Sequence, residues 1–129
     1  AKRYVGEDAE GRIADPDLRR RLILNSMRSR AYSQTFQRAA REAKAGTGTS
    51  PALSALKNLG SDVSQDRAEL IVEILGNRGL GWEGDGYEVD ELEATRAWLH
   101  SKAYSIYGGS FEVQNNITAK RVLNLPDYQ

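Results

Sequence analysis

The sequence predicts an all-α protein, an up-and-down helical bundle, from three observations. Glycine and proline divide the 129 residues into long segments. Within these segments apolar and small side chains recur every three or four residues, which is the spacing that lines one face of a helix. The alternating pattern of a strand is confined to 70–75, and that segment fits better as the end of a helix. At this length we expect residues 1–129 to form a single domain.

Two long helices begin at matching start signals. In Asp15–Pro16 a capping residue precedes a proline at the first helical position, where the missing N–H costs no hydrogen bond, and this predicts a helix over 16–45. Ser50–Pro51 repeats the signal and predicts a second helix over 51–77. Both are longer than the average of about three turns, which suits a bundle. The stripe of the first helix is widened by three further apolar residues, Ile23, Leu24 and Met27.

The segment 76–86 contains five glycines in eleven residues, so it predicts a loop. Within it, 79–84 match the G-x-G-x-x-G pattern of dinucleotide-binding loops. That pattern works only where a strand precedes it and a helix N-terminus receives the phosphates directly after it. Here a long helix precedes it, and the acidic side chains of Glu83, Asp85 and Glu88 would repel phosphate. A dinucleotide site is therefore not expected in this loop.

Two further helices complete the predicted fold. Asp90 and Glu93 have the spacing of a capping box and predict the start of a helix over 90–106. A pair of glycines ends that helix, and Ser110 caps a last one over 110–123. The result is a bundle of four helices.

Composition excludes several classes of function. The chain has 18 basic and 18 acidic residues, and this balance argues against a dedicated nucleic-acid binder. Arg19–Arg21, Arg28 and Arg30 form either a phosphate-binding patch or a solvated helix face paired with acidic residues, and we favour the second. Nucleic-acid binding stays an alternative that a salt-dependent retardation assay would test. No membrane span of about 20 apolar residues is present, and we expect a cytoplasmic protein.

The sequence contains few of the residues that metal binding or nucleophilic catalysis usually requires. The chain has no cysteine, which excludes a disulfide, a thiolate nucleophile and a zinc–thiolate site. His100 is the only histidine, so a His-based metal site or a Ser-His-Asp triad would lack its usual groups. We therefore expect no metal site.

The most informative segment surrounds Gly108, Gly109 and Ser110. A pair of glycines lets a second backbone come close, and the free N–H groups at the start of the next helix favour an anion or the polar edge of a ligand. The alternative is a plain connection between helices with a serine cap. The residue types alone are compatible with both.

The segment 106–126, IYGGSFEVQNNITAKRVLNLP, closely resembles the C-terminal signature of acyl-CoA dehydrogenases, which commonly end in GGTxEIQxNIIAxRVLGLP. The rest of the chain agrees in layout, with an Asp-Pro opening a long helix, Ser54 and Lys57 at the entry to the next, and a glycine-rich loop after Leu75. The resemblance covers nearly the whole chain. It implies the C-terminal helical bundle of these enzymes without its first helix, and hence a fragment of a longer protein.

For the parent protein, the resemblance implies FAD-dependent oxidation of an acyl-CoA to the enoyl-CoA. In this family a carboxylate removes the α-proton while a hydride leaves the β-carbon for the flavin. The bundle also builds a homo- or hetero-oligomer, and parts of it reach the FAD of a neighbouring subunit. We expect FAD as the cofactor, acyl-CoA as the substrate, and no activity of this fragment alone.

The resemblance also carries over particular residues. Gly108 stands where one branch of the family has its catalytic Glu, and because glycine cannot abstract a proton, no catalytic residue is expected in this chain. Other branches place the base on the first bundle helix. A non-catalytic partner subunit or structural domain of the same fold is the alternative. The FAD contacts fall in two groups: Gly109, Ser110 and Glu112 in the terminal motif, and Glu73, Gly76 and Asn77 where the family has Gln-x-x-Gly-Gly at the adenosine end.

Overall fold

The computed structural model describes residues 1–46 and 52–126, and this part of the chain is helical and contains no strand. The predicted all-α class is confirmed. The elements, in chain order, are α1 (Lys2–Val5), α2 (Pro16–Lys44), α3 (Ala52–Leu75), the 3₁₀ helix η1 (Gly76–Leu80), α4 (Val89–Ser101), the 3₁₀ helix η2 (Lys102–Ser105) and α5 (Phe111–Arg121).

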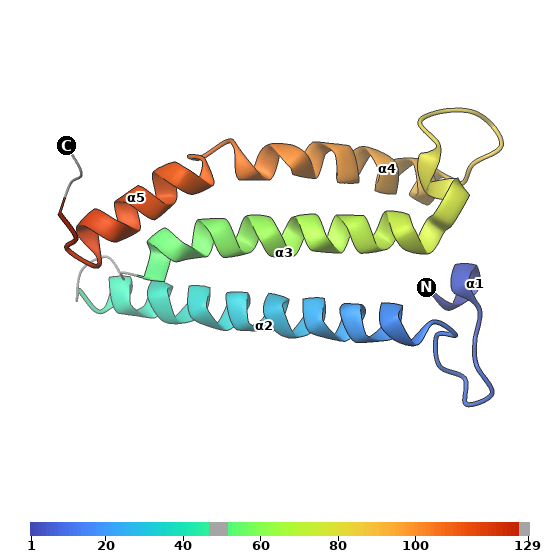
Figure 1. The fold of residues 1–129 in the computed structure, drawn as a ribbon, viewed down its shortest axis with the longest axis horizontal. Coiled ribbons are helices and arrows are strands. Elements are labelled where there is room, and N and C mark those ends of the chain that lie inside the picture. The colour runs from blue at the N-terminus through green and yellow to red at the C-terminus, as the bar shows by residue number, and fades with distance from the viewer. Residues whose placement is uncertain (47–51, 127–129) are drawn as a thin grey trace.

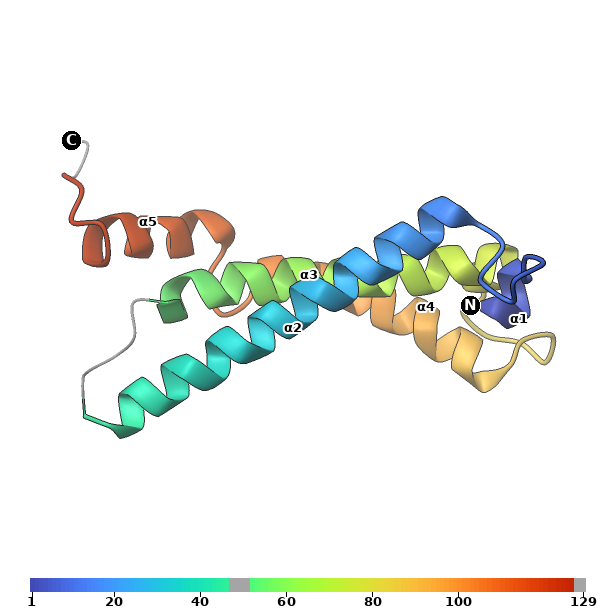
Figure 2. The same cartoon turned by 90° about the horizontal axis from the view of Figure 1, so that it is seen from below.

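Helix α3 is the centre of the arrangement (Figure 1). Helix α2 packs along one side of it, and α4, η2 and α5 follow one another along the other side. Helices α2, α3 and α4 run up and down in turn, whereas α5 continues in the direction of α4. Seen from below, α2 crosses α3 obliquely (Figure 2). The four long helices therefore form three layers.

The core follows one face of α3. Its side chains Leu56, Val63 and Leu70 are buried. They are seven residues apart, which is about two helical turns, so all three lie on the same face of the helix. Leu18 and Ala39 are the buried apolar residues of α2. The three residues that widen the stripe of α2 stay outside this core, because the main packing partner of that helix among the described residues is α3, along one side. Ile23 is 61% exposed and Met27 63%, and Leu24 is exposed as well.

The sequence located the start of α2 correctly. Oδ1 of Asp15 accepts hydrogen bonds from the backbone N–H groups of Asp17, at 2.9 Å, and Leu18, at 3.0 Å. These bonds satisfy two of the N–H groups that a helix start leaves without a partner. The matching signal at Ser50–Pro51 lies outside the described residues.

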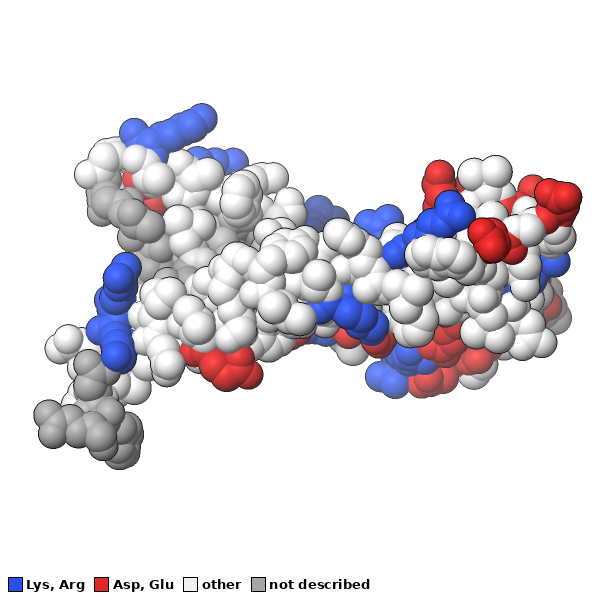
Figure 3. All heavy atoms as spheres, turned by 90° about the horizontal axis from the view of Figure 1, so that it is seen from above, with Lys and Arg blue, Asp and Glu red and all other residues white. Residues whose placement is uncertain are grey.

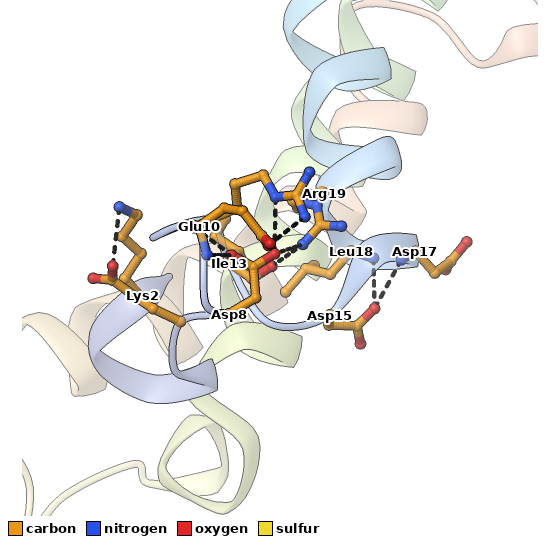
Figure 4. A network of polar contacts seen from close by, with 10 residues as sticks. Lys2, Asp8, Glu10, Ile13, Asp15, Asp17, Leu18 and Arg19 are labelled. Atoms are coloured by element: carbon orange, nitrogen blue, oxygen red, sulfur yellow. Dashed lines mark hydrogen bonds and ion pairs between the residues drawn. The ribbon is translucent and has the colours of Figure 1, made fainter.

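The residues before α2 are tied to its first turns through Asp8 (Figure 4). Oδ2 of Asp8 accepts hydrogen bonds from Nε of Arg12, at 2.8 Å, and from Nη1 of Arg19, at 3.0 Å. The backbone N–H of Arg12 donates to Oδ1 at 2.8 Å, and this bond is the largest of the effects that lower the pKa of Asp8. The same Arg19 donates to the carbonyl of Ile13. The N-terminal segment is thus folded back onto α2.

The capping box predicted at Asp90 and Glu93, for the start of α4, is wrong by two residues. Helix α4 begins at Val89, and Oε2 of Glu91, not the side chain of Glu93, accepts the N–H of the capping residue Glu88 at 2.9 Å. Asp90 therefore lies inside the first turn. The shift has a tertiary cause, because Glu91 is also the partner of an arginine and a tyrosine from other elements.

The predicted helix over 90–106 is divided in the structure. Helix α4 ends at Ser101 and tightens into η2, where side chains of α3 bind its carbonyls. Nε2 of Gln65 donates to the carbonyl of Ser101 at 2.9 Å, and Oγ of Ser61 donates to that of Tyr104 at 2.7 Å. The helix predicted over 51–77 similarly ends at Leu75, since Gly76 takes a positive φ of 57° and η1 follows.

One buried carboxylate joins three of these elements. Glu91 is 0% exposed, and its Oε1 accepts from Nε of Arg78 in η1 at 2.5 Å and from the hydroxyl of Tyr4 in α1 at 3.0 Å. The bond from Arg78 is the main cause that lowers the pKa of Glu91, whereas burial raises the pKa of Tyr4. Arg78 also donates to the carbonyl of Gly86 at 3.2 Å, which holds the glycine-rich loop. A buried charge is tolerated only when it is paired in this way.

Replacing this carboxylate tests how much it contributes to the stability of the fold. Glu91→Gln keeps the shape but removes the charge that Arg78 faces, and we expect the melting temperature to fall by roughly 5–10 °C. Glu93→Gln, an exposed position on the same helix, is the control and leaves the melting temperature unchanged. Equal effects of the two changes in a thermal melt would show that the Glu91 network does not stabilise the fold.

Gly79 provides a second test, of packing between η1 and α3. A Cβ at Gly79 would lie 2.7 Å from the carbonyl oxygen of Val72, so backbone must move to accept it. Gly79→Ala should cost about 1–3 kcal/mol of unfolding free energy. The control is Gly86→Ala, because a Cβ there meets no atom within 4 Å. Chemical denaturation of both variants measures the difference, and equal stabilities would contradict the tight packing.

Candidate functional site

The turn between η2 and α5 needs both of its glycines. Gly108 has φ 70° and Gly109 has φ 99°, a left-handed region that side chains disfavour. Nε2 of Gln114 reaches back and donates to the carbonyl of Gly108 at 2.9 Å. A Cβ on Gly109 would lie 2.7 Å from that same Nε2, whereas one on Gly108 would meet nothing within 4 Å. The turn is therefore closed by the helix that follows it.

Ser110 starts α5 as the sequence predicted. Its Oγ accepts from the N–H of Val113 at 3.4 Å. A hydrogen bond with Ser110 is the largest of the causes that lower the pKa of Glu112, and the positive charge of Lys57 acts in the same direction. Glu112 is thus an exposed, ionised carboxylate in the first turn of a helix, where the helix dipole favours negative charge. The turn offers a ligand both N–H donors and a carboxylate acceptor.

The second predicted group lies where α3 passes into η1. The carboxylate of Glu73 accepts two bonds from Arg21 of α2, both at 2.6 Å, and this pairing raises the pKa of Arg21. The pairing was not anticipated from the sequence, and it occupies the side chain that stands in place of the family's Gln. Gly76 and Asn77 are exposed beside it.

The structure keeps the two groups apart. Asn58, near the start of α3, donates to the carbonyl of Phe111 at 3.4 Å and to Oδ1 of Asn115 at 3.0 Å, which fixes α5 at that end. Gly76 follows the other end of α3, about 27 Å further along the helix axis. Figure 1 shows α5 and η1 at opposite ends of the molecule. One chain therefore does not bring all the predicted cofactor contacts into one place.

A groove next to the glycine turn was not anticipated. It has a volume of about 560 Å³ and is bordered by α2, α3, η2 and Gly108. Gly60 lets the ring of Tyr32 lie close to α3 at the groove, since a Cβ there would lie 2.9 Å from that ring. The spacing of Lys57, Gly60 and Ser64 on one face of α3 was the available signal.

Four of the five arginines in the predicted cluster, Arg19, Arg20, Arg21 and Arg28, pair with acidic residues, the arrangement favoured over a phosphate patch, and Arg30 forms no ion pair among the described residues. Arg20 lies 2.9 Å from Asp17, and Arg28 binds Asp66 and lies 3.7 Å from Asp62. On the face that carries α4 and α5, acidic side chains gather mainly at the end of the glycine-rich loop, basic side chains also lie near the middle, and uncharged atoms cover much of the rest (Figure 3).

Clusters of metal-ligating side chains and membrane-spanning helices are absent from the described ranges. His100 is exposed and packs edge-on against the ring of Tyr104, with centroids 5.6 Å apart. In residues 1–46 and 52–126, histidine and acidic side chains nowhere gather in threes that could hold a metal ion. None of the helices described here combines the length and apolarity that crossing a membrane requires.

Comparison with known proteins supports the resemblance seen in the terminal motif. The family model described as "Acyl-CoA dehydrogenase, C-terminal domain" matches residues 1–123. Over 70 residues, or 54% of the chain, the sequence is 41% identical to the acyl-CoA dehydrogenase IpdE1 of Mycolicibacterium smegmatis and to that of Mycobacterium tuberculosis. The matched part amounts to 17% of the length of each relative.

The fold has a counterpart among solved structures. The ChsE4-ChsE5 complex from Mycobacterium tuberculosis contains a chain that superposes with a TM-score of 0.73 at 23% identity. The match covers 95% of this chain and 32% of that one. At this identity the likeness concerns the fold. Since the family model spans almost every residue from the first helix to the end of α5, the chain belongs to the acyl-CoA dehydrogenase family, as its C-terminal domain.

Proposed function

We propose that the chain is the C-terminal domain of an FAD-dependent enzyme that oxidises an acyl-CoA to the enoyl-CoA. The observation that carries the proposal is the turn at 108–110, embedded in a family match that covers residues 1–123. FAD, when bound, supplies the acceptor for the hydride. The domain's own residues would bind FAD and orient it.

The turn has the chemistry to hold a polar edge of FAD. Glycine at 109 lets a ligand approach the backbone, and the start of α5 presents N–H groups toward it. The ionised Glu112 can accept hydrogen bonds from ligand hydroxyl or N–H groups. Ser110 keeps this helix start in place. These features fit the contacts that we propose for Gly109, Ser110 and Glu112.

The contacts at the far end of α3 serve a different cofactor molecule in this proposal. Glu73 is about 22 Å, and Gly76 about 27 Å, from the part of α3 that holds α5, and Asn77 follows Gly76. In an oligomer, one end of the chain would meet one FAD and the other end would meet the FAD of a neighbouring subunit. The exposed apolar side chains of Ile23 and Met27 are suited to such contacts between subunits.

Proton abstraction is assigned to a residue outside this chain. Gly108 has no side chain, and its φ of 70° would strain a Glu at that position. The fully buried carboxylate, Glu91, is held by Arg78 and Tyr4. This observation also favours the second candidate, a partner subunit that contributes to the fold and assembly without a base of its own. A cytoplasmic location stays a prediction.

The test is Gly109→Val in the assembled enzyme that contains this chain. The substitution places a side chain against Gln114 where the ligand is proposed to approach, and we expect FAD affinity to fall about tenfold or more. Gly84→Val is the matched control, because Gly84 also has a positive φ, of 116°, and lies in the remote loop with open space around it. Both variants lose stability through backbone strain.

The two variants therefore separate a structural turn from a ligand-facing one. Flavin absorbance after equilibrium dialysis measures the retained FAD, and circular dichroism checks that each variant is folded. Unchanged FAD affinity in a folded Gly109→Val enzyme would reduce the motif to a connection between helices.

A further inference from the structure

The glycine-rich loop between η1 and α4 presents large apolar side chains to solvent. Leu80, at the end of η1, is 74% exposed, Trp82 is 53% exposed, and Val89, the first residue of α4, is 69% exposed. Single exposed apolar side chains are ordinary on a protein surface, whereas a group of them in one short segment is typical of an interaction site.

Trp82 is held in place although half of it is exposed. Nη2 of Arg96 in α4 donates to the carbonyl of Trp82 at 2.8 Å, and the same guanidinium lies 5.4 Å from the centre of the Trp82 ring. Gly81 lets the ring of Tyr87 pack against the loop backbone, since a Cβ there would lie 2.6 Å from that ring. A ring that is already fixed loses little conformational freedom when a partner covers it, and this favours binding.

The charged side chains around these apolar residues are acidic. The segment 79–95 contains six acidic residues and no basic one, and only the buried Glu91 forms an ion pair, with Arg78. The others are exposed and form no ion pair among the described residues: Glu83, Asp85, Glu88, Asp90 and Glu93. Figure 3 shows acidic side chains gathered at this end of the molecule.

The charge of this surface indicates which partner it fits. In protein interfaces a buried aromatic anchor is commonly surrounded by a polar rim. Carboxylates without counter-ions repel one another, and a partner with basic side chains relieves that repulsion and is steered toward the surface. A second copy is a poor occupant, because a symmetric contact would place the same acidic groups against each other.

We propose that the segment 80–93 is a docking surface for a different protein whose contact surface is basic, with Trp82 as the apolar anchor and the exposed carboxylates as the rim. The surface requires neither FAD nor an acyl-CoA.

Binding of a defined basic probe to the full chain tests this surface. The probe is a short amphipathic helical peptide of leucine and lysine that carries fluorescein, and the comparison peptide has glutamate in place of lysine. Fluorescence anisotropy should show binding of the lysine peptide and none of the glutamate peptide. The affinity should fall as salt is added, because exposed charges are screened.

Matched variants locate the binding on the chain. Trp82→Ala removes the anchor, and Glu83→Gln combined with Asp85→Asn removes two charges of the rim. Each change should weaken binding of the lysine peptide about tenfold or more. The control combines Glu7→Gln with Glu10→Gln, which removes two exposed carboxylates from the segment before α2 and should leave the affinity unchanged. Circular dichroism checks that each variant is folded.

The emission of Trp82 gives a second readout. The chain has two tryptophans, so Trp98→Phe leaves Trp82 as the only one. In that protein the lysine peptide should shift the emission to shorter wavelength, because the exposed part of the ring leaves water.

Four results overturn the proposal. The first three are absence of binding by the lysine peptide, equal weakening by the Glu7 and Glu10 control, and unchanged affinity in folded Trp82→Ala. The fourth is a shift of the Trp82 emission when the protein concentration alone is raised, which would assign the surface to a second copy of the chain.

Discussion

The fold depends on a buried carboxylate that no single element can satisfy. Glu91 has no exposed surface, so its charge and both oxygens must be met within the protein. Arg78 comes from η1, the hydroxyl of Tyr4 from α1, and the N–H of Glu88 from the start of α4. These three segments converge at one end of α3. The convergence also positions the ends of the glycine-rich loop and holds η1 next to the predicted contacts at Gly76.

The opposite end of α3 lies beside the turn that we propose as a cofactor contact. There the backbone turns through Gly108 and Gly109, and α5 begins with a serine cap beside an ionised Glu112. Acidic and basic side chains lie on different faces of α3. Its acidic residues Glu69 and Glu73 form ion pairs with η2 and α2, whereas Lys57 and Arg67 border an open groove. The length of α3 thus separates the two groups of proposed cofactor contacts, and in the proposed function two subunits would combine them on one FAD.

Features set by neighbouring residues could be predicted from the sequence, and features set across the fold could not. The starts of α2 and α5 depend on Asp15 and Ser110 and the N–H groups that directly follow them. By contrast, the choice of Glu91 over Glu93 depends on Arg78, thirteen residues away in the chain, and the end of α4 depends on Gln65 of α3. The lining of the groove likewise combines residues far apart in the chain, such as Gly60 of α3 and Tyr32 of α2, which lie close together. The family was evident from the terminal motif, because that motif is one continuous segment.

The most direct test is the pH dependence of the melting temperature of the wild type and of Glu91→Gln. The pKa of Glu91 lies below its ordinary value of 4.5 in the folded protein, so the stability it contributes is present above about pH 4.5 and is lost as the pH falls through the lowered value. Other carboxylates, such as Asp8 and Glu112, titrate in both proteins and cancel in the difference. The wild type should be the more stable protein at neutral pH, and its advantage should shrink steadily below about pH 4.5. A difference that stays constant down to pH 2, or that is absent at pH 7, would contradict the structural role of the buried carboxylate.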